Sequence, residues 1–285
     1  MFLLAVLLGF LSMAGFAFAN VSSQPLAKKF GNGQVLFLRE LTVVIVLALL
    51  AIPSLHNIKD VHYVLFALAL GLAGYLPLLA FTHGLKVSRV GIVSPIAGCS
   101  PLVTVILAFA ILGTPIKSIQ WLAIVLVILA NVGASINLKN FKDSNIAKLT
   151  SGVPVALMAA LGWGLFFFAI IYPTKAIGPW LTSFLAELGV TVAAAIHLLV
   201  SKQKVPLRQA LSLKIMGNGL CIVVGIIAFT YGVSRYNIGI VASLSNSVAL
   251  LSALLAAYFF KERLNRNEMI AAAAMITGVV LITVS

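Results

Sequence analysis

Two stretches of the sequence, FTHGLKVSRVGIV at residues 81–93 and FTYGVSRYNIGIV at residues 229–241, match one another at a shift of 148 positions. A shift of 147 aligns the segments that precede them in each half of the chain. The matched positions include polar and small residues as well as apolar ones: Gly15/Gly162, Lys28/Lys175, Glu40/Glu187, Thr82/Thr230, Gly84/Gly232 and Gly91/Gly239. Because a shared apolar composition would not produce matches at Gly, Lys, Glu and Thr, the pattern indicates an internal duplication.

The composition predicts a multi-pass membrane protein of the cell (inner or plasma) membrane. Of 285 residues, 62% are hydrophobic and 9% are charged, and the mean hydropathy is +1.15. Soluble domains are nearer half apolar and a quarter charged. Weakly charged runs such as 90–113 and 238–260 exceed the roughly 20 residues that cross a bilayer as a helix. Spans of this length leave no room for a soluble domain.

Clusters of Gly, Pro, Asn and Lys separate ten predicted transmembrane helices. They cover residues 2–24, 34–52, 61–84, 90–112, 118–138, 152–172, 179–200, 213–233, 238–260 and 267–285. We expect an all-α membrane protein in which residues 1–138 form a first five-helix repeat, 139–151 a linker and 152–285 a second repeat. Because five is odd, the second repeat enters the membrane upside down, as in many secondary transporters.

The basic residues are distributed as an inverted repeat requires. The loops after spans 1, 3, 5, 7 and 9, with their flanks, hold 15 Lys and Arg residues, and the opposite face holds 4. The positive-inside rule then predicts that the basic face is cytoplasmic and both termini are outside. The apolar segment at 2–19 lacks the basic start of a signal peptide, and we interpret it as a span.

Several functional classes are disfavoured. The net charge of +13 is scattered between apolar segments, unlike the basic patch of a nucleic-acid-binding protein. Cys99 and Cys221 lie in apolar runs without Cys or His at ligand spacing, so we predict neither a disulfide nor a metal site. No catalytic or nucleotide-binding motif emerges. We therefore predict a protein that is not an enzyme and has no cofactor.

Short motifs in both halves resemble those of a known family. They are LGWG at 161–164, LFLRE at 36–40, and YFFKE at 258–262 followed by Gly278. On these, the chain resembles the EamA-type transporters of the drug/metabolite transporter (DMT) superfamily. The resemblance implies two five-helix repeats and small-molecule efflux, with both termini cytoplasmic, contrary to the charge count. The sequence departs from the pattern at Phe16, where tryptophan is expected, at Thr114 opposite Glu262, and at Ala186 opposite Arg39.

Glu40 and Glu187 are the leading candidates for substrate binding or coupling. Each lies about six to eight residues into its span, at related depths from opposite faces. A carboxylate at the centre of a membrane helix costs about 2.5 to 3.5 kcal/mol to insert, so each should face protein or water. One interpretation is that they bind a cationic group or take up a proton. The other is that they lie in an early helical turn, stabilised by the helix dipole near the surface.

Aromatic and amide side chains are further binding candidates. Phe16 and Trp163 could stack on a planar or cationic substrate, or pack within the bundle. His83 and Tyr231 could line a cavity or lie in the interfacial belt. The amide side chains that are costliest to bury, and that could line a polar cavity or join neighbouring helices, are Asn20, Gln24 and Asn246.

Arg39 precedes Glu40 directly in the chain. Neighbours on a helix do not face one another, so we expect no ion pair between Arg39 and Glu40 and expect Arg39 to reach the headgroups or a substrate.

Three prolines are hinge candidates. Pro77, Pro95 and Pro101 interrupt the backbone hydrogen bonds of their spans.

Together these features predict a secondary active transporter working by alternating access. Its expected cargo is a small metabolite such as an amino acid, or a drug-like cation, exported by proton antiport or exchange. A passive uniporter or channel is the first alternative, and an intramembrane lipid-modifying subunit is the second. The expected partners are the small-molecule substrate, protons and the lipid bilayer, and the sequence leaves a homodimer open.

Overall fold

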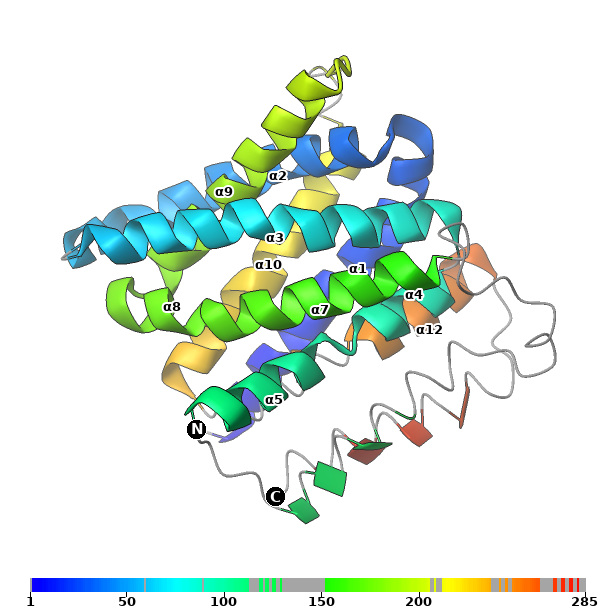
Figure 1. The fold of residues 1–285 in the computed structure, drawn as a ribbon. Helices are drawn as coiled ribbons and strands as arrows, with labels where there is room; N and C mark the ends of the chain where they lie inside the picture. The colour runs from blue at the N-terminus through cyan, green and yellow to red at the C-terminus, as the bar shows by residue number, and fades with distance from the viewer. Residues whose placement is uncertain are drawn as a thin grey trace.

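A computed structural model describes residues 2–58, 60–88, 90–112, 152–205, 212–236 and 248–261, with isolated positions at 118–129, 208, 241, 244–245 and 269–281. In the first half the elements are α1 (Phe2–Phe30), α2 (Asn32–Ala51), the 3-10 helix η1 (Ile52–Asn57), α3 (Val61–Val87), α4 (Val90–Ala97) and α5 (Ser100–Leu112). In the second half they are α7 (Val153–Ala169), α8 (Ile171–Ile177), α9 (Pro179–Val200), α10 (Leu213–Arg235) and α12 (Val248–Phe260). Figure 1 shows their arrangement.

The described helices form a membrane-embedded bundle. Six helical segments in these ranges are long and apolar enough to cross a bilayer. Large apolar side chains cover their outer faces; Leu76 is 68% exposed and Leu199 77% exposed. Surfaces of this kind are rare on soluble monomers. The chain is therefore a multi-pass membrane protein, as the composition predicted.

Two predicted spans are each broken into two helices, one of them beside the hinge candidate Pro101 and the other at a position that was not predicted. The span at 90–112 is interrupted at Gly98 and Cys99, where α4 ends and α5 begins. Pro101 has no N–H to pair with the carbonyl of Ala97, and it fits the first turn of a new helix. In the predicted span at 152–172, the first helix ends at Ala169. Pro173, in the first turn of α8, has no N–H to pair with the carbonyl of Ala169.

The other boundaries differ less, and three prolines do not break their helices. Pro25 lies inside α1, which continues to Phe30 instead of ending at residue 24. Pro77 lies inside an uninterrupted α3, and Pro95 lies inside α4. The predicted spans at 118–138 and 267–285 fall almost entirely outside the described residues. The count of ten spans therefore stays a prediction.

The two halves pack in the same way at equivalent positions. A Cβ on Gly84 would lie 2.9 Å from the Val93 side chain, and a Cβ on Gly232 would lie 2.7 Å from the Val241 side chain. Both glycine and valine are displaced by 148 positions between the halves. The match found at residues 81–93 and 229–241 is thus a match of three-dimensional contacts.

The crossings between the halves repeat as well. Gly71 of α3 lies directly against the backbone of Ala186 in α9, and Gly219 of α10 lies against the backbone carbonyl of Arg39 in α2. Gly219 is the repeat equivalent of Gly71, and Ala186 is that of Arg39. Such exchange of partners is expected when two similar units pack about a two-fold axis. It places the packed pair α2 and α9 at the centre.

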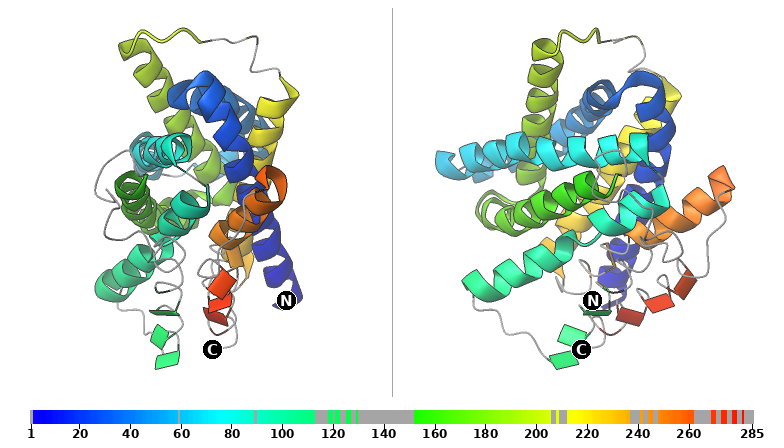
Figure 2. Two further views of the ribbon diagram at one scale, coloured as in Figure 1. Left: turned by 90° about the vertical axis from the view of Figure 1, so that its right-hand side faces the viewer. Right: turned by 45° about the vertical axis from the view of Figure 1, so that its right-hand side comes forward.

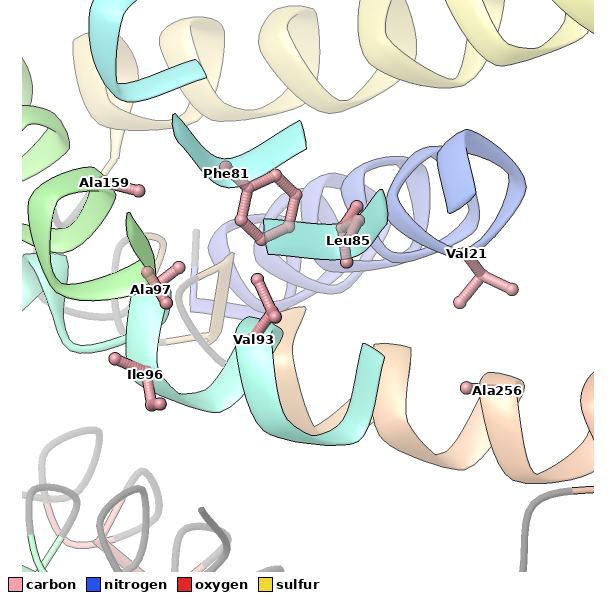
Figure 3. Packing of buried hydrophobic residues seen from close by; sticks show 9 residues of the cluster. Val21, Phe81, Leu85, Val93, Ile96, Ala97, Ala159 and Ala256 are labelled. Carbon is pink, nitrogen blue, oxygen red and sulfur yellow. The ribbon is translucent and has the colours of Figure 1, made fainter. Parts of the chain in front are cut away.

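A buried apolar cluster joins the helices around α3. Phe81 and Leu85 of α3 pack with Val93 and Ala97 of α4 and with alanines of α7. Figure 3 shows the Phe81 ring directed from α3 toward α4, with Ala159 of α7 beside it. Helices α3 and α7 run side by side in the different views of Figures 1 and 2. This cluster fixes one wall of the cavity described next.

Candidate functional site: a cavity between the two repeats

A cavity of about 190 Å³ lies between the repeats. Helices of both halves line it: α1, α2, α3, α4 and the first residue of α5 from the first half, and α7, α9, α10 and α12 from the second. Several lining residues are repeat equivalents, including Glu40/Glu187, Phe16/Trp163 and Phe81/Phe229. The cavity therefore lies on the axis that relates the two halves.

The acidic side of the cavity is formed by α2 and α9. Glu40 is only 1% exposed and Glu187 is half-buried, and both line the cavity. The two carboxyl groups come from helices that pack against each other, and both line the same cavity. Oε1 of Glu40 is bound by Arg39, and Oε2 has no hydrogen-bond partner among the described residues. The pair can therefore hold a proton or a cation, and the surface-solvated interpretation of Glu40 is wrong.

Arg39 also lies in the cavity wall, where it forms the ion pair that was not expected. Its Nε donates to Oε1 of Glu40 at 3.0 Å, in an ion pair whose side chains are 5% and 1% exposed. Its Nη1 donates to Ser23 Oγ at 3.3 Å. Adjacent helical residues point apart, but the long arginine stem bends back because a buried charge is costly without a partner. Arg39 is 4% exposed and does not extend to the headgroups.

The repeat equivalent of Arg39 is Ala186, which makes the charge distribution asymmetric. The cavity holds two carboxyl groups and one guanidinium from these two helices. When all three are ionised, the set carries one net negative charge. This residual charge favours a cation or a proton at the site.

Three cavity-lining residues carry buried polar atoms that have no hydrogen-bond partner among the described residues. They are Oε2 of Glu40, Oγ of Ser183 and Oγ of Ser94. Ser183 lies one turn before Glu187 on α9, so the two share a helix face. Sequence reasoning missed Ser183, although its spacing from Glu187 was a usable signal. Buried polar atoms without partners are uncommon and call for a ligand, water or ion.

Aromatic residues form another part of the cavity wall. Trp163 and Phe81 lie with ring centroids 5.0 Å apart, and Phe167 and Phe229 lie 5.9 Å apart. Phe16 joins them in lining the cavity. The sequence analysis singled out Phe16 and Trp163 but missed Phe81 and Phe229, which open the two matching stretches. The wall can pack on an apolar group or hold a cation by cation–π attraction.

The remaining predicted residues separate into two groups. Asn20 lines the cavity and donates to Ser252 Oγ at 3.4 Å. Gln24 instead donates to the carbonyl of Ser88 at 3.4 Å, away from the cavity lining. Asn246 lies outside the described residues.

His83 and Tyr231 also lie outside the cavity lining. Nδ1 of His83 is 3.2 Å from Nδ2 of Asn32. The Tyr231 ring stacks on Trp180 with centroids 5.8 Å apart. Each contact joins the second helix of a repeat to the third, so both residues brace the two repeats.

These features define a class: a membrane protein of two inverted repeats with a charged and aromatic cavity at their junction. The model of the EamA-like transporter family matches residues 3–136 and 150–284. The chain therefore belongs to the EamA-like transporter family, as the short motifs indicated, and it is transporter-like.

Other comparisons concern the fold. A solved structure described as "Crystal structure of protein" has 15% sequence identity and a TM-score of 0.69, over 97% of this chain and 95% of the other. At this identity the likeness shows a shared fold alone. A search of curated proteins finds no match.

Proposed function

We propose that this protein is a secondary active transporter that exports a small organic cation in exchange for protons. The observation that carries the proposal is that Glu40 and Glu187, equivalent residues of the two repeats, both line one cavity to which both repeats contribute. A proton and a cationic substrate then compete for the same carboxyl groups. Competition for one site is the simplest way to couple two opposite fluxes, because occupancy by one partner excludes the other.

The charges favour a cation over an amino acid as the cargo. An amino acid carries a carboxylate that needs a cationic partner. Arg39, the cationic side chain that lines the cavity, already donates to Glu40 and Ser23. The aromatic wall would accommodate the apolar part of an amphipathic cation. A drug-like or metabolite amine fits these walls better than a zwitterion.

The inverted repeats supply the alternating access. Equivalent contacts in the two halves, such as Gly71 against Ala186 and Gly219 against Arg39, allow the halves to exchange conformations. The cavity then opens first to one side of the membrane and next to the other, while the binding site stays at the junction. The break between α4 and α5 lies beside cavity-lining Gly98 and Ser100. It offers a place where the first repeat can bend.

The test is transport in liposomes with and without a pH gradient. Purified protein should drive accumulation of an organic cation such as 2-phenylethylammonium above its own gradient when the pH gradient is imposed. Glu187→Gln and Glu40→Gln should be measured separately, and at least one should abolish pH-driven flux. Asp60→Asn is the matched control, because Asp60 is exposed at the start of α3.

Three results would overturn the proposal. Flux that never exceeds the substrate gradient would establish a passive uniporter or channel. Unchanged pH-driven flux in both glutamine variants would remove the carboxyl pair from the mechanism. A covalently altered product would indicate an intramembrane enzyme.

A further inference from the structure

The cavity carries more acceptors than a plain cation needs. Oε1 of Glu40 is already used by Arg39, but Oε2 accepts no hydrogen bond among the described residues. The hydroxyl of Ser183 also has no partner there, although Ser183 is 4% exposed. Both residues line the cavity. The acidic side therefore presents unused hydrogen-bonding capacity together with its net negative charge.

These atoms belong to one side of the cavity. Ser183 and Glu187 share a face of α9 at a spacing of four residues, which brings side chains within about 5–6 Å. Glu40 lines the same cavity from α2, which packs against α9. Glu40 Oε2, Ser183 Oγ and the Glu187 carboxylate thus offer three acceptors to one cavity from two packed helices.

A primary ammonium group has three N–H donors and one positive charge, which matches this set. A quaternary ammonium carries the same charge and no donor. Binding it would leave the buried acceptors of Glu40 and Ser183 unsatisfied, and a site built to bond an N–H rejects analogues that lack one. The aromatic wall alone would accept either ion, because cation–π attraction does not require a donor.

We propose that the cavity selects cations bearing N–H groups, with the ammonium group between Glu40, Ser183 and Glu187 and the apolar body against Trp163 and Phe81. This inference rests on the proposed transport of organic cations and adds the substrate class and its orientation. Ser183 is the specificity-determining residue, because its neutral hydroxyl can accept a hydrogen bond from a cation with N–H groups and offers no such interaction to a cation without them.

The experiment compares 2-phenylethylammonium with its N,N,N-trimethyl analogue. Binding to the purified full chain in lipid nanodiscs is measured by calorimetry at neutral pH. We expect the trimethyl ion to bind about tenfold more weakly or worse, the effect of losing one or more hydrogen bonds to charged or buried groups. Ser183→Ala should weaken binding of the primary amine several-fold and leave binding of the trimethyl ion unchanged or improved.

The controls separate hydrogen bonding from size. Thr182→Val is the matched variant, because Thr182 precedes Ser183 on α9 and has a similarly buried hydroxyl that lies outside the cavity lining and has no partner in the part of the chain that the structure describes. It should change neither affinity. If Ser183→Ala improves only the trimethyl ion and leaves the primary amine untouched, exclusion is steric and the inference is wrong. Equal binding of the two ions overturns the inference while the proposed function stands. Failure of both to bind overturns both.

Discussion

Arg39 and Glu40 show how burial changes the behaviour of neighbouring residues. On an exposed helix two adjacent side chains point apart, which is why no pair between them was predicted. Here both are almost fully buried, and the guanidinium bridges to the carboxylate and to Ser23. The identities of the acidic residues could be read from the sequence, but their partners could not, because the partners depend on how helices cross.

Removing Arg39 should expose the cost of a buried carboxylate. We expect Arg39→Met to destabilise the protein by about 3 kcal/mol, the scale seen when one partner of a buried ion pair is removed. The double variant Arg39→Met with Glu40→Gln should recover much of that loss, because position 40 then no longer carries a buried charge without its partner. Thermal unfolding in detergent, followed by tryptophan fluorescence, measures both. If the loss of stability in the double variant equals the sum of the losses in Arg39→Met and Glu40→Gln, the two residues are not coupled.

Asp60 caps the N-terminus of α3. Its Oδ1 accepts hydrogen bonds from the backbone and the ring of His62, each at 2.8 Å. The backbone hydrogen bond, followed by that from the ring, lowers the pKa of Asp60. A carboxyl group whose pKa is lowered on folding stabilises the fold above its unfolded pKa, and this contribution is lost as the pH falls through the folded pKa.

Replacement of this cap should therefore have a pH-dependent effect. Asp60→Ala should lower the melting temperature at neutral pH, because the first turn of α3 loses its acceptor. The difference from the original protein should shrink in acid. Asp60→Asn keeps a capping acceptor without a titrating charge, so it should be better tolerated. If the difference in melting temperature between Asp60→Ala and the original protein stays the same across the acidic range, the ionised form of Asp60 is not what stabilises α3.

At the level of helices, close crossings fix the bundle. Gly219 of α10 lies so near α2 that a Cβ would be 2.9 Å from the carbonyl oxygen of Arg39. Gly217, on the same helix, would place its Cβ in open space, with nothing within 4 Å. The two glycines therefore form a matched pair with opposite expectations.

We expect Gly219→Ala to destabilise the protein by about 1–3 kcal/mol, because backbone must move to admit the methyl group. Gly217→Ala should stabilise it by about 0.5–1 kcal/mol, the usual gain for alanine inside a helix. Melting temperatures of the two variants, measured side by side, test this. Equal effects would show that α10 does not approach α2 as described.

The positions of the helices were largely predictable, but which prolines end a helix was not. Apolar runs and loop residues located α2, α3, α9 and α10 to within a few residues. Pro101, Pro77 and Pro95 were all hinge candidates, yet a helix ends only beside Pro101, whereas Pro77 and Pro95 lie inside helices and the break beside Pro173 was missed. Whether a proline ends a helix depends on neighbouring helices that a single sequence does not reveal.

At the scale of the whole molecule, the duplication was readable because paired positions retain their residue type. Glu40 and Glu187 were found through the offset, and the structure brings them together from α2 and α9. Ser183, Phe81 and Phe229 were missed as site residues. Their roles follow from where the two repeats face each other, and Ser183 has Leu36 as its counterpart.

Inversion of the repeats predicts that equivalent residues lie on opposite sides of the membrane. Lys28 ends α1 and Lys175 ends α8, both are exposed, and they are repeat equivalents. In a background with Cys99→Ser and Cys221→Ala, Lys28→Cys and Lys175→Cys should react with an impermeant maleimide from opposite faces. The charge count predicts that Lys28 is on the cytoplasmic face. Labelling of both from one face would establish parallel repeats.

The guanidinium of Arg39 in the central wall has a consequence for the kinetics of the transport cycle. Its repeat-equivalent position holds Ala186, so the two halves differ in fixed charge beside the cavity. In two identical halves, release of a cation to either compartment would have the same rate constant. With a fixed positive charge in one half and a methyl group in the other, the two release steps should have unequal rate constants, while the gradients still set the net direction of transport.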